Sequence, residues 1–139
     1  MTRHAAGWRS HCPISFALDV IGDRWTLLIL RDLLIEGKTT YGEIQSSEER
    51  IATNLLADRL AWLEHQGIVR KRRDPQERRR VIYRVTQKGR DLLPVMLEMI
   101  RWSAKYDPAT AAPSPFVKRI AADRDGVLRD LAAGPLRRA

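Results

Sequence analysis

A cluster of basic residues at positions 70–80 is the strongest chemical signal in this sequence. It holds seven basic residues against two acidic ones, a local excess of five positive charges in a chain of net charge +8. Guanidinium groups pair well with phosphate oxygens, so such a cluster suits a polyanion. We expect contacts to phosphates or to a minor groove first from Arg78, Arg79 and Arg80, and next from Arg72 and Arg73. The alternative for each arginine is a generic basic loop.

A second set of polar side chains lies just before this cluster, on a predicted helix over residues 52–65. The buried stripe of this helix consists of Leu56, Leu60 and Leu63. A helix fits the major groove of DNA, where Asn pairs with adenine and Arg with guanine or phosphate. The candidate DNA-contacting residues of the helix are Thr53, Asn54, Asp58 and Arg59. Asp58 would either accept from cytosine or orient Arg59. The alternative, a solvated face of an ordinary surface helix, is weakened by the basic cluster that follows.

A single cysteine, Cys12, offers thiol chemistry. It precedes a predicted helix, and Arg9, His11 and the helix dipole could lower its pKa and favour reaction with oxidants or electrophiles. As the only cysteine it excludes an internal disulfide, so it could act only through an intersubunit bridge, a mixed disulfide or an adduct. A structural or unused thiol is the alternative.

Hydrophobic periodicity predicts the elements that position these groups. Helices are predicted over residues 13–21, 24–35, 41–47, 52–65, 87–106 and 116–131. Asp23 is an expected N-cap, and Thr40 with Glu43 forms a capping box. Alternating residues around a turn at Asp74 and Pro75 predict a β-hairpin after the fourth helix. The fold class is therefore mainly α with a small β-hairpin wing, a winged helix-turn-helix.

Composition changes divide the chain into four segments. We expect a flexible arm over residues 1–11, a DNA-binding and dimerisation domain over 12–106, a proline-rich linker over 107–115 and a helical extension over 116–139. Pro94 predicts a kink or a shifted start in the fifth helix, and Gly126 weakens the last one. The extension either packs on the dimer, covers an effector pocket or serves as a structural cap.

Several other classes of protein fit the sequence poorly. The histidines His4, His11 and His65 show no metal spacing, and no glycine-rich phosphate loop occurs, so we expect no enzyme, metal or cofactor. Paired aromatic residues on strands, which RNA-binding platforms need, are also missing. No apolar stretch reaches the roughly 18 residues of a membrane span, and no signal core follows the N-terminus, which predicts a cytoplasmic protein with no membrane partner. Non-specific chromosome packaging remains an alternative function.

Spaced blocks of residues resemble one known family, the HxlR-type winged-helix regulators of transcription. The blocks are residues 18–33 (LDVIGDRWTLLILRDL), 41–44 (YGEI), 51–60 (IATNLLADRL), 67–69 (GIV) and 80–89 (RVIYRVTQKG). They occur in order within residues 12–106. Here residues 49–52 (ERIA) replace the Pro-Gly-Ile-Ser-like approach of many members, so the operator preference can differ.

The resemblance implies a homodimer that binds double-stranded DNA and regulates transcription, as a repressor or a dual regulator. The first helix and the helix after the wing would pair across a two-fold axis, and two recognition helices would meet a palindromic operator, with half-sites about one helical turn apart. The long helix over residues 87–106 has apolar surface to spare for such a contact. Some members sense oxidants or electrophiles with an N-terminal cysteine at the position of Cys12, and the effector here is left open.

Overall fold

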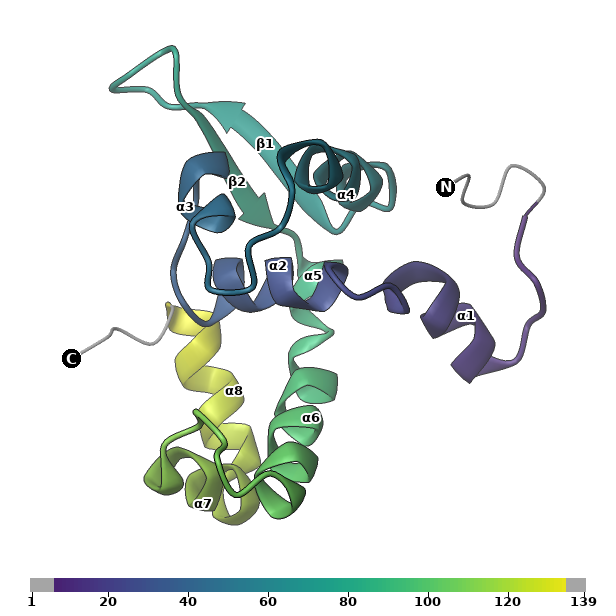
Figure 1. The fold of residues 1–139 in the computed structure, drawn as a ribbon, viewed down its shortest axis with the longest axis vertical. Helices are drawn as coiled ribbons and strands as arrows, with labels where there is room; N and C mark the ends of the chain where they lie inside the picture. The colour runs from purple at the N-terminus through teal and green to yellow at the C-terminus, as the bar shows by residue number, and fades with distance from the viewer. Residues whose placement is uncertain (1–6, 135–139) are drawn as a thin grey trace.

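The N-terminal part of the chain forms a winged helix-turn-helix head. The computed structural model describes residues 7–134. The head contains α1 (Pro13–Ile21), α2 (Thr26–Leu34), α3 (Tyr41–Gln45), α4 (Thr53–His65), β1 (Val69–Arg73) and β2 (Val81–Val85). Figure 1 shows α3, α4 and the hairpin above α2, while α1 projects to one side. The predicted fold class, mainly helical with a two-stranded wing, is confirmed.

The C-terminal part of the chain extends away from the head. It contains α5 (Gln87–Arg90), α6 (Leu93–Tyr106), α7 (Ser114–Ala122) and α8 (Arg124–Ala133). In Figure 1, α6 leads down from the head, α7 lies at the far end and α8 returns towards the head. Helices α7 and α8, which form the C-terminal extension, therefore fold back towards the head.

Two predicted helices are interrupted in the structure. The helix expected over residues 87–106 breaks between Arg90 and Leu93, and Pro94 stands in the first turn of α6, where proline is tolerated. The single helix expected over residues 116–131 is wrong. Asp123 separates α7 from α8 and accepts from the Gly126 N–H at 3.0 Å, which caps the new helix. Helix α7 also begins at Ser114, inside the expected linker.

Side chains satisfy the backbone donors at the starts of α3 and α2, although the N-cap position of α2 is Trp25 and not the expected Asp23. Thr40 accepts from the Glu43 N–H and the Glu43 carboxylate accepts from the Thr40 N–H, so the predicted capping box is confirmed. The Asp23 carboxylate accepts from the N–H groups of Trp25 and Thr26, at 3.0 and 3.1 Å, just before α2. Both interactions satisfy backbone donors that a helix start leaves open.

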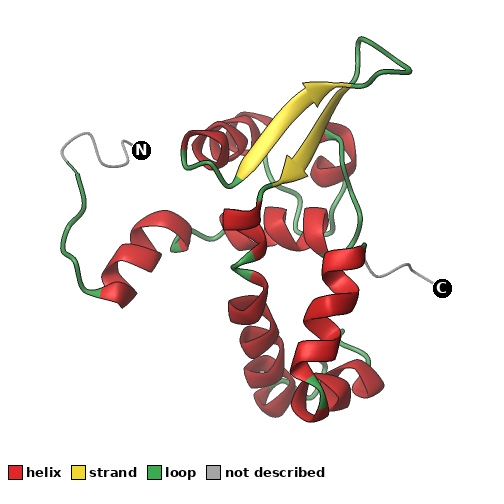
Figure 2. Cartoon of the chain, turned by 180° about the vertical axis from the view of Figure 1, so that it is seen from behind, coloured by secondary structure: helices red, strands yellow, loops and turns green. Residues whose placement is uncertain are grey.

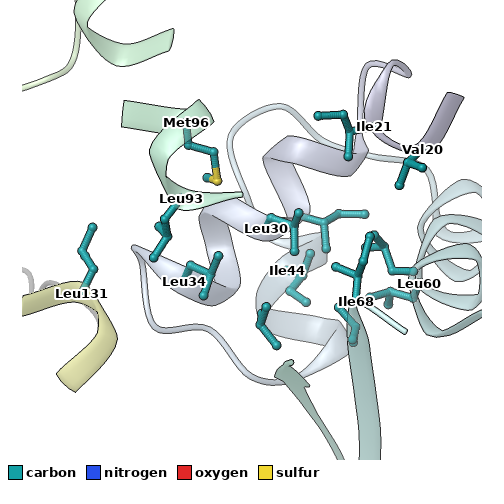
Figure 3. Packing of buried hydrophobic residues seen from close by; sticks show 14 of the residues in the cluster. Val20, Ile21, Leu30, Leu34, Ile44, Leu60, Ile68, Leu93, Met96 and Leu131 are labelled. Atoms are coloured by element: carbon teal, nitrogen blue, oxygen red, sulfur yellow. The ribbon is translucent and has the colours of Figure 1, made fainter. Parts of the chain in front are cut away.

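One hydrophobic core joins the head to the C-terminal helices. Figure 3 shows Leu30 and Leu34 of α2 near Leu93 and Met96 of α6, with Leu131 of α8 at its edge. Ile120 and Val127 of the extension are each 1% exposed and belong to the same cluster. The extension thus shares the core, as a structural cap would.

The hairpin register decides which basic side chains share a face. Val69 pairs with Val85 near the core, and Arg70 pairs with Arg84 one step further out. Successive residues of a strand point to opposite faces, so Arg72 shares the face of Arg70, and Lys71 lies on the other. Figure 2 shows the tip of this hairpin extending well past the helices.

Candidate nucleic-acid interface

Helix α4 presents a surface of short side chains. Leu56, Leu60 and Leu63 are at most 2% exposed and hold the helix against the core. The residues exposed on its free side are Thr53, Asn54, Ala57, Asp58 and Ala61. Short polar and small apolar groups let a helix approach base edges closely. Three of the four predicted contact residues, Thr53, Asn54 and Asp58, therefore lie where a duplex could reach them.

Arg59 is not among them, and the expectation that its side chain faces outward is wrong. The residue is 7% exposed, and its Nε lies 3.0 Å from Oδ2 of Asp23. Its Nη1 also contacts the Asp58 carboxylate. Burying an arginine is tolerated only when the charge is paired, and Asp23 supplies that charge. The contact with Asp58 fits the second role expected for that residue, orienting Arg59.

The turn before α4 is held by an ion pair. Nη1 and Nη2 of Arg31 donate to the two oxygens of the Glu49 carboxylate at 2.7 and 2.9 Å. This bidentate contact lowers the pKa of Glu49 to about 2 and raises the pKa of Arg31. Arg50 follows with φ +56°, a conformation in which its side chain is exposed directly ahead of α4. Arg50 is a further candidate for a phosphate contact, which the sequence analysis missed.

The tip of the wing is a defined loop built around Asp74. Its carboxylate accepts from Nε of Arg80 at 2.8 Å and from the Gln76 N–H at 2.9 Å. These bonds, first the one from Gln76 and then the one from Arg80, lower the pKa of Asp74. Arg80 is therefore tied to the loop by one side of its guanidinium, although its side chain is 51% exposed.

The remaining wing arginines are more available. Nη1 of Arg73 donates to the Arg78 carbonyl at 2.9 Å. Arg72, Arg78 and Arg79 are exposed, and within residues 7–134 their side chains take part in no ion pair. Of the five wing residues predicted, these three suit a phosphate or groove contact best. Arg70 and Arg84, which face each other across the hairpin, were not predicted because only the strand register brings them together.

Cys12 is exposed and stands at the N-cap of α1. Its side chain closes no cap hydrogen bond, but the neighbouring N–H groups of Ser15 and then Ile14 lower the pKa of the thiol. The cause is thus the helix start. The expected neighbour Arg9 lies near Asp19: its backbone N–H donates to Oδ2 of Asp19 at 3.2 Å, and its Nε lies 4.0 Å from Oδ1.

Two helices carry apolar side chains that their own chain leaves uncovered. In α1 these are Ile14 and Leu18, which are 72% and 59% exposed. In α6 they are Met99, Trp102 and Tyr106, with Trp102 68% exposed. These are the helices on which the sequence analysis placed the dimer contact, and such exposed apolar faces are typical of interaction surfaces.

A hollow lies where the extension meets the head. Its volume is about 690 Å³, within the range of small-molecule sites. Its lining includes the apolar side chains of Ile100 and Phe116 and the basic side chains of Arg31 and Lys38. An effector pocket and a structural cap therefore both stay predictions for the extension.

Two other classes of site are missing from residues 7–134. No helix in this range is long and apolar enough to cross a membrane. In the same range no three His, Cys, Asp or Glu side chains lie together as metal ligands do. His65 instead lies against Trp62, with ring centroids 6.1 Å apart.

Known proteins with similar sequences are regulators of transcription. The chain is 35% identical over 95 residues to the uncharacterised helix-turn-helix transcriptional regulator YdeP of Bacillus subtilis, which covers 68% of this chain and 73% of YdeP. It is 34% identical over 96 residues to the regulator YodB of Bacillus subtilis, with 68% of this chain and 85% of YodB covered.

Solved structures similar to this chain are also regulators of transcription. The structure resembles PA1607, a candidate transcription factor, with a TM-score of 0.68, 37% identity, and 81% of this chain and 75% of PA1607 covered. It resembles reduced YodB with a TM-score of 0.58, 34% identity, and 73% and 100% covered. Residues 20–111 match the HxlR-like helix-turn-helix family. The chain belongs to this family, whose members are winged-helix regulators of transcription and not enzymes.

Proposed function

We propose that this regulator binds a palindromic operator as a homodimer and represses transcription, or both represses and activates it. The observation that carries this proposal is the exposed Thr53–Asn54 surface of α4 beside a hairpin whose Arg78 and Arg79 are unpaired among residues 7–134. Short side chains would read base edges, and the arginines would hold phosphates or a narrow minor groove.

The uncovered apolar faces of α1 and α6 support the proposed dimer. A symmetric contact between two copies would bury Ile14 and Leu18 of one helix and Trp102 of the other, which water now reaches. Two copies of α4 would then meet the same face of the duplex about one helical turn apart. Pairing also doubles the number of phosphate contacts, which strengthens binding at modest salt.

The test is selection of duplexes from a randomised library by the purified wild-type chain, followed by titration of the selected and random duplexes. We expect a palindromic sequence bound at least about 10³-fold more tightly than random DNA. Equal affinity for the selected and the random duplexes would indicate non-specific chromosome packaging in place of operator recognition. Failure to bind any duplex at modest ionic strength would overturn the proposal. A reporter gene fused to the selected operator then distinguishes repression from activation.

A second candidate function, oxidant or electrophile sensing by Cys12, has a specific observation in its favour. The thiol is exposed and has a lowered pKa at the start of α1, the helix proposed to dimerise. HypR, a redox regulator, is a structural relative in its oxidised form with a TM-score of 0.58 and 33% identity, and YodB is a relative in a quinone-bound form. Two Cys12 thiols could lose two protons and two electrons to an oxidant such as diamide, which is reduced to the hydrazine, and form one intersubunit disulfide.

Diamide treatment of the DNA complex tests this second function. We expect the wild type to migrate as a disulfide-linked dimer on non-reducing gels and to lose affinity for its operator, with recovery after dithiothreitol. Cys12→Ser should keep its affinity under the same treatment. Equal release of the wild type and Cys12→Ser would end the hypothesis.

A further inference from the structure

Two polar contacts join the recognition helix α4 to the corner between α1 and α2. The first is the ion pair of Arg59 with Asp23, with 3.0 Å between Nε and Oδ2 and both side chains less than 10% exposed. The second is a hydrogen bond from Nε1 of Trp62 to the carbonyl of Val20, at 3.0 Å. Arg59 and Trp62 are three residues apart, so they share one face of α4 and attach it at two points.

Asp23 occupies the centre of this corner. Besides Arg59, its carboxylate accepts from the N–H groups of Trp25 and Thr26, and its Oδ1 accepts from Oγ1 of Thr26 at 2.5 Å. Thr26 is fully buried. The same carboxylate therefore fixes the first turn of α2 and the middle of α4, which leaves it little freedom to move.

The corner is also where α1 ends and the chain turns into α2. Val20 belongs to the last turn of α1, and Figure 1 shows α1 projecting from α2 away from the C-terminal helices. Tilting α1 against α4 would have to break either the Trp62 bond or the packing around Asp23. The two side chains of α4 thus contact Val20 in the last turn of α1 and Asp23 just after that helix.

We propose that Arg59 is a positioning residue, which, with Trp62, locks α4 to α1 and so sets the separation of the two recognition helices in the dimer. This inference rests on the proposed operator binding and dimerisation. The competing role, a direct phosphate contact, requires Arg59 to leave Asp23, because the side chain is 9% exposed where it lies. Separation from Asp23 would break an ion pair between two side chains that are each less than 10% exposed, which is unfavourable.

The DNA test uses the selected operator with its centre lengthened or shortened by one base pair at a time. We expect the wild type to prefer one spacing, and Arg59→Met to bind all spacings within about threefold of each other, since its helices can adapt. The dependence of affinity on salt should keep the wild-type slope, because no phosphate contact is lost. A slope reduced by about one unit with an unchanged spacing preference would show a phosphate contact and overturn the inference.

Two further variants separate positioning from loss of folding. Trp62→Phe replaces the indole by a smaller ring that lacks the N–H donor, and it should broaden the spacing preference to a smaller degree, even if Arg59→Met folds poorly. Arg59→Lys keeps the charge and should restore part of the preference. Arg119→Met, which breaks an exposed ion pair with Asp130 in the extension, is the matched control and should leave the preference unchanged.

A DNA-free measurement makes the outcome independent of operator binding. In a Cys12→Ser background, His11→Cys and Ala61→Cys place spin labels on exposed positions before α1 and on α4. With unlabelled chain in excess, the distance distribution between them should be narrow with Arg59 and Trp62 intact, and broader in Arg59→Met. An equally narrow distribution in Arg59→Met would overturn the inference, whether or not the chain binds DNA.

Discussion

Helix α4 and the β1–β2 hairpin lie next to each other in the sequence but are held in different ways. Three leucines with at most 2% exposure fix α4, and even its arginine is buried. In the hairpin, only Val69 and Val85 are buried in the strands, and the tip depends on Asp74 and its local bonds. Packing gives a surface one orientation, which reading base edges requires, whereas exposed arginines supply charge that adapts to a phosphate backbone.

The largest expected difference between the two regions concerns stability. Leu56 is fully buried, so Leu56→Ala should lower the free energy of unfolding by about 2–5 kcal/mol. Arg79→Ala in the wing should change it by less than about 0.5 kcal/mol, since the side chain is exposed. Urea denaturation at a fixed protein concentration measures both. Equal effects would mean that the hairpin contributes to the fold as much as α4 does.

Next in size is the loss of sequence discrimination at α4. Asn54→Ala should weaken preference for one base pair of each half-site by about 1–3 kcal/mol, because the amide can no longer pair with adenine. Binding of the selected operator and of its single-base variants gives this value. The salt slope should stay at the wild-type level. Uniform weakening on all sequences would show that Asn54 only contacts the backbone.

The wing should show the opposite behaviour. Replacing both Arg78 and Arg79 by Ala should weaken binding to operator and random DNA by the same factor, because phosphates carry no base identity. The slope of log affinity against log salt should fall by about two units, one for each lost contact. Arg119→Ala in α7 is the control and should leave the slope unchanged. A greater loss on the operator than on random DNA would assign the two arginines a reading role.

The smallest expected effect concerns two ion pairs that acid should weaken, Arg31–Glu49 before α4 and Arg80–Asp74 at the wing tip. The pKa of Glu49 is lowered from 4.5 to about 2, so its contribution to stability is complete above pH 4.5 and is lost as the pH falls towards 2. Solvent reaches the pair, so the loss should stay below about 1 kcal/mol. Glu49→Gln should flatten the stability profile in this window, and Glu48→Gln should not. Asp74→Asn should speed amide hydrogen exchange at the wing tip and leave the exchange rates of α4 unchanged.

Local patterns predicted much of the fold. Thr40 and Glu43 are three residues apart, so their capping box could be recognised without any tertiary information. The leucine stripe of α4 likewise identified the side that faces the core. The break at Asp123 was missed although its signal was local, because the cap lies within an otherwise continuous amphipathic pattern.

The candidate site was harder to predict where partners are distant in sequence. Arg59 lies three residues after Leu56, at the edge of the buried stripe, so its burial had a signal, but its partner Asp23 is 36 residues away. Whether an arginine at such an edge turns to solvent or to a carboxylate depends on the packing of α4 against the α1–α2 corner. The availability of Arg72 and the tethering of Arg80 also depend on strand register and loop geometry, which the basic cluster alone does not define.

The pairing of Arg70 with Arg84 has a consequence for handling the protein. Like charges placed opposite each other on two strands repel, so the folded hairpin is under electrostatic tension until an anion neutralises it. By thermodynamic linkage, any polyanion that prefers the folded form raises the melting temperature, with about 2.7 kcal/mol gained at a hundredfold excess over its dissociation constant. Preparations that retain cellular nucleic acid will therefore have a higher melting temperature than preparations free of it. Heparin added to the nucleic-acid-free protein will raise the melting temperature in the same way.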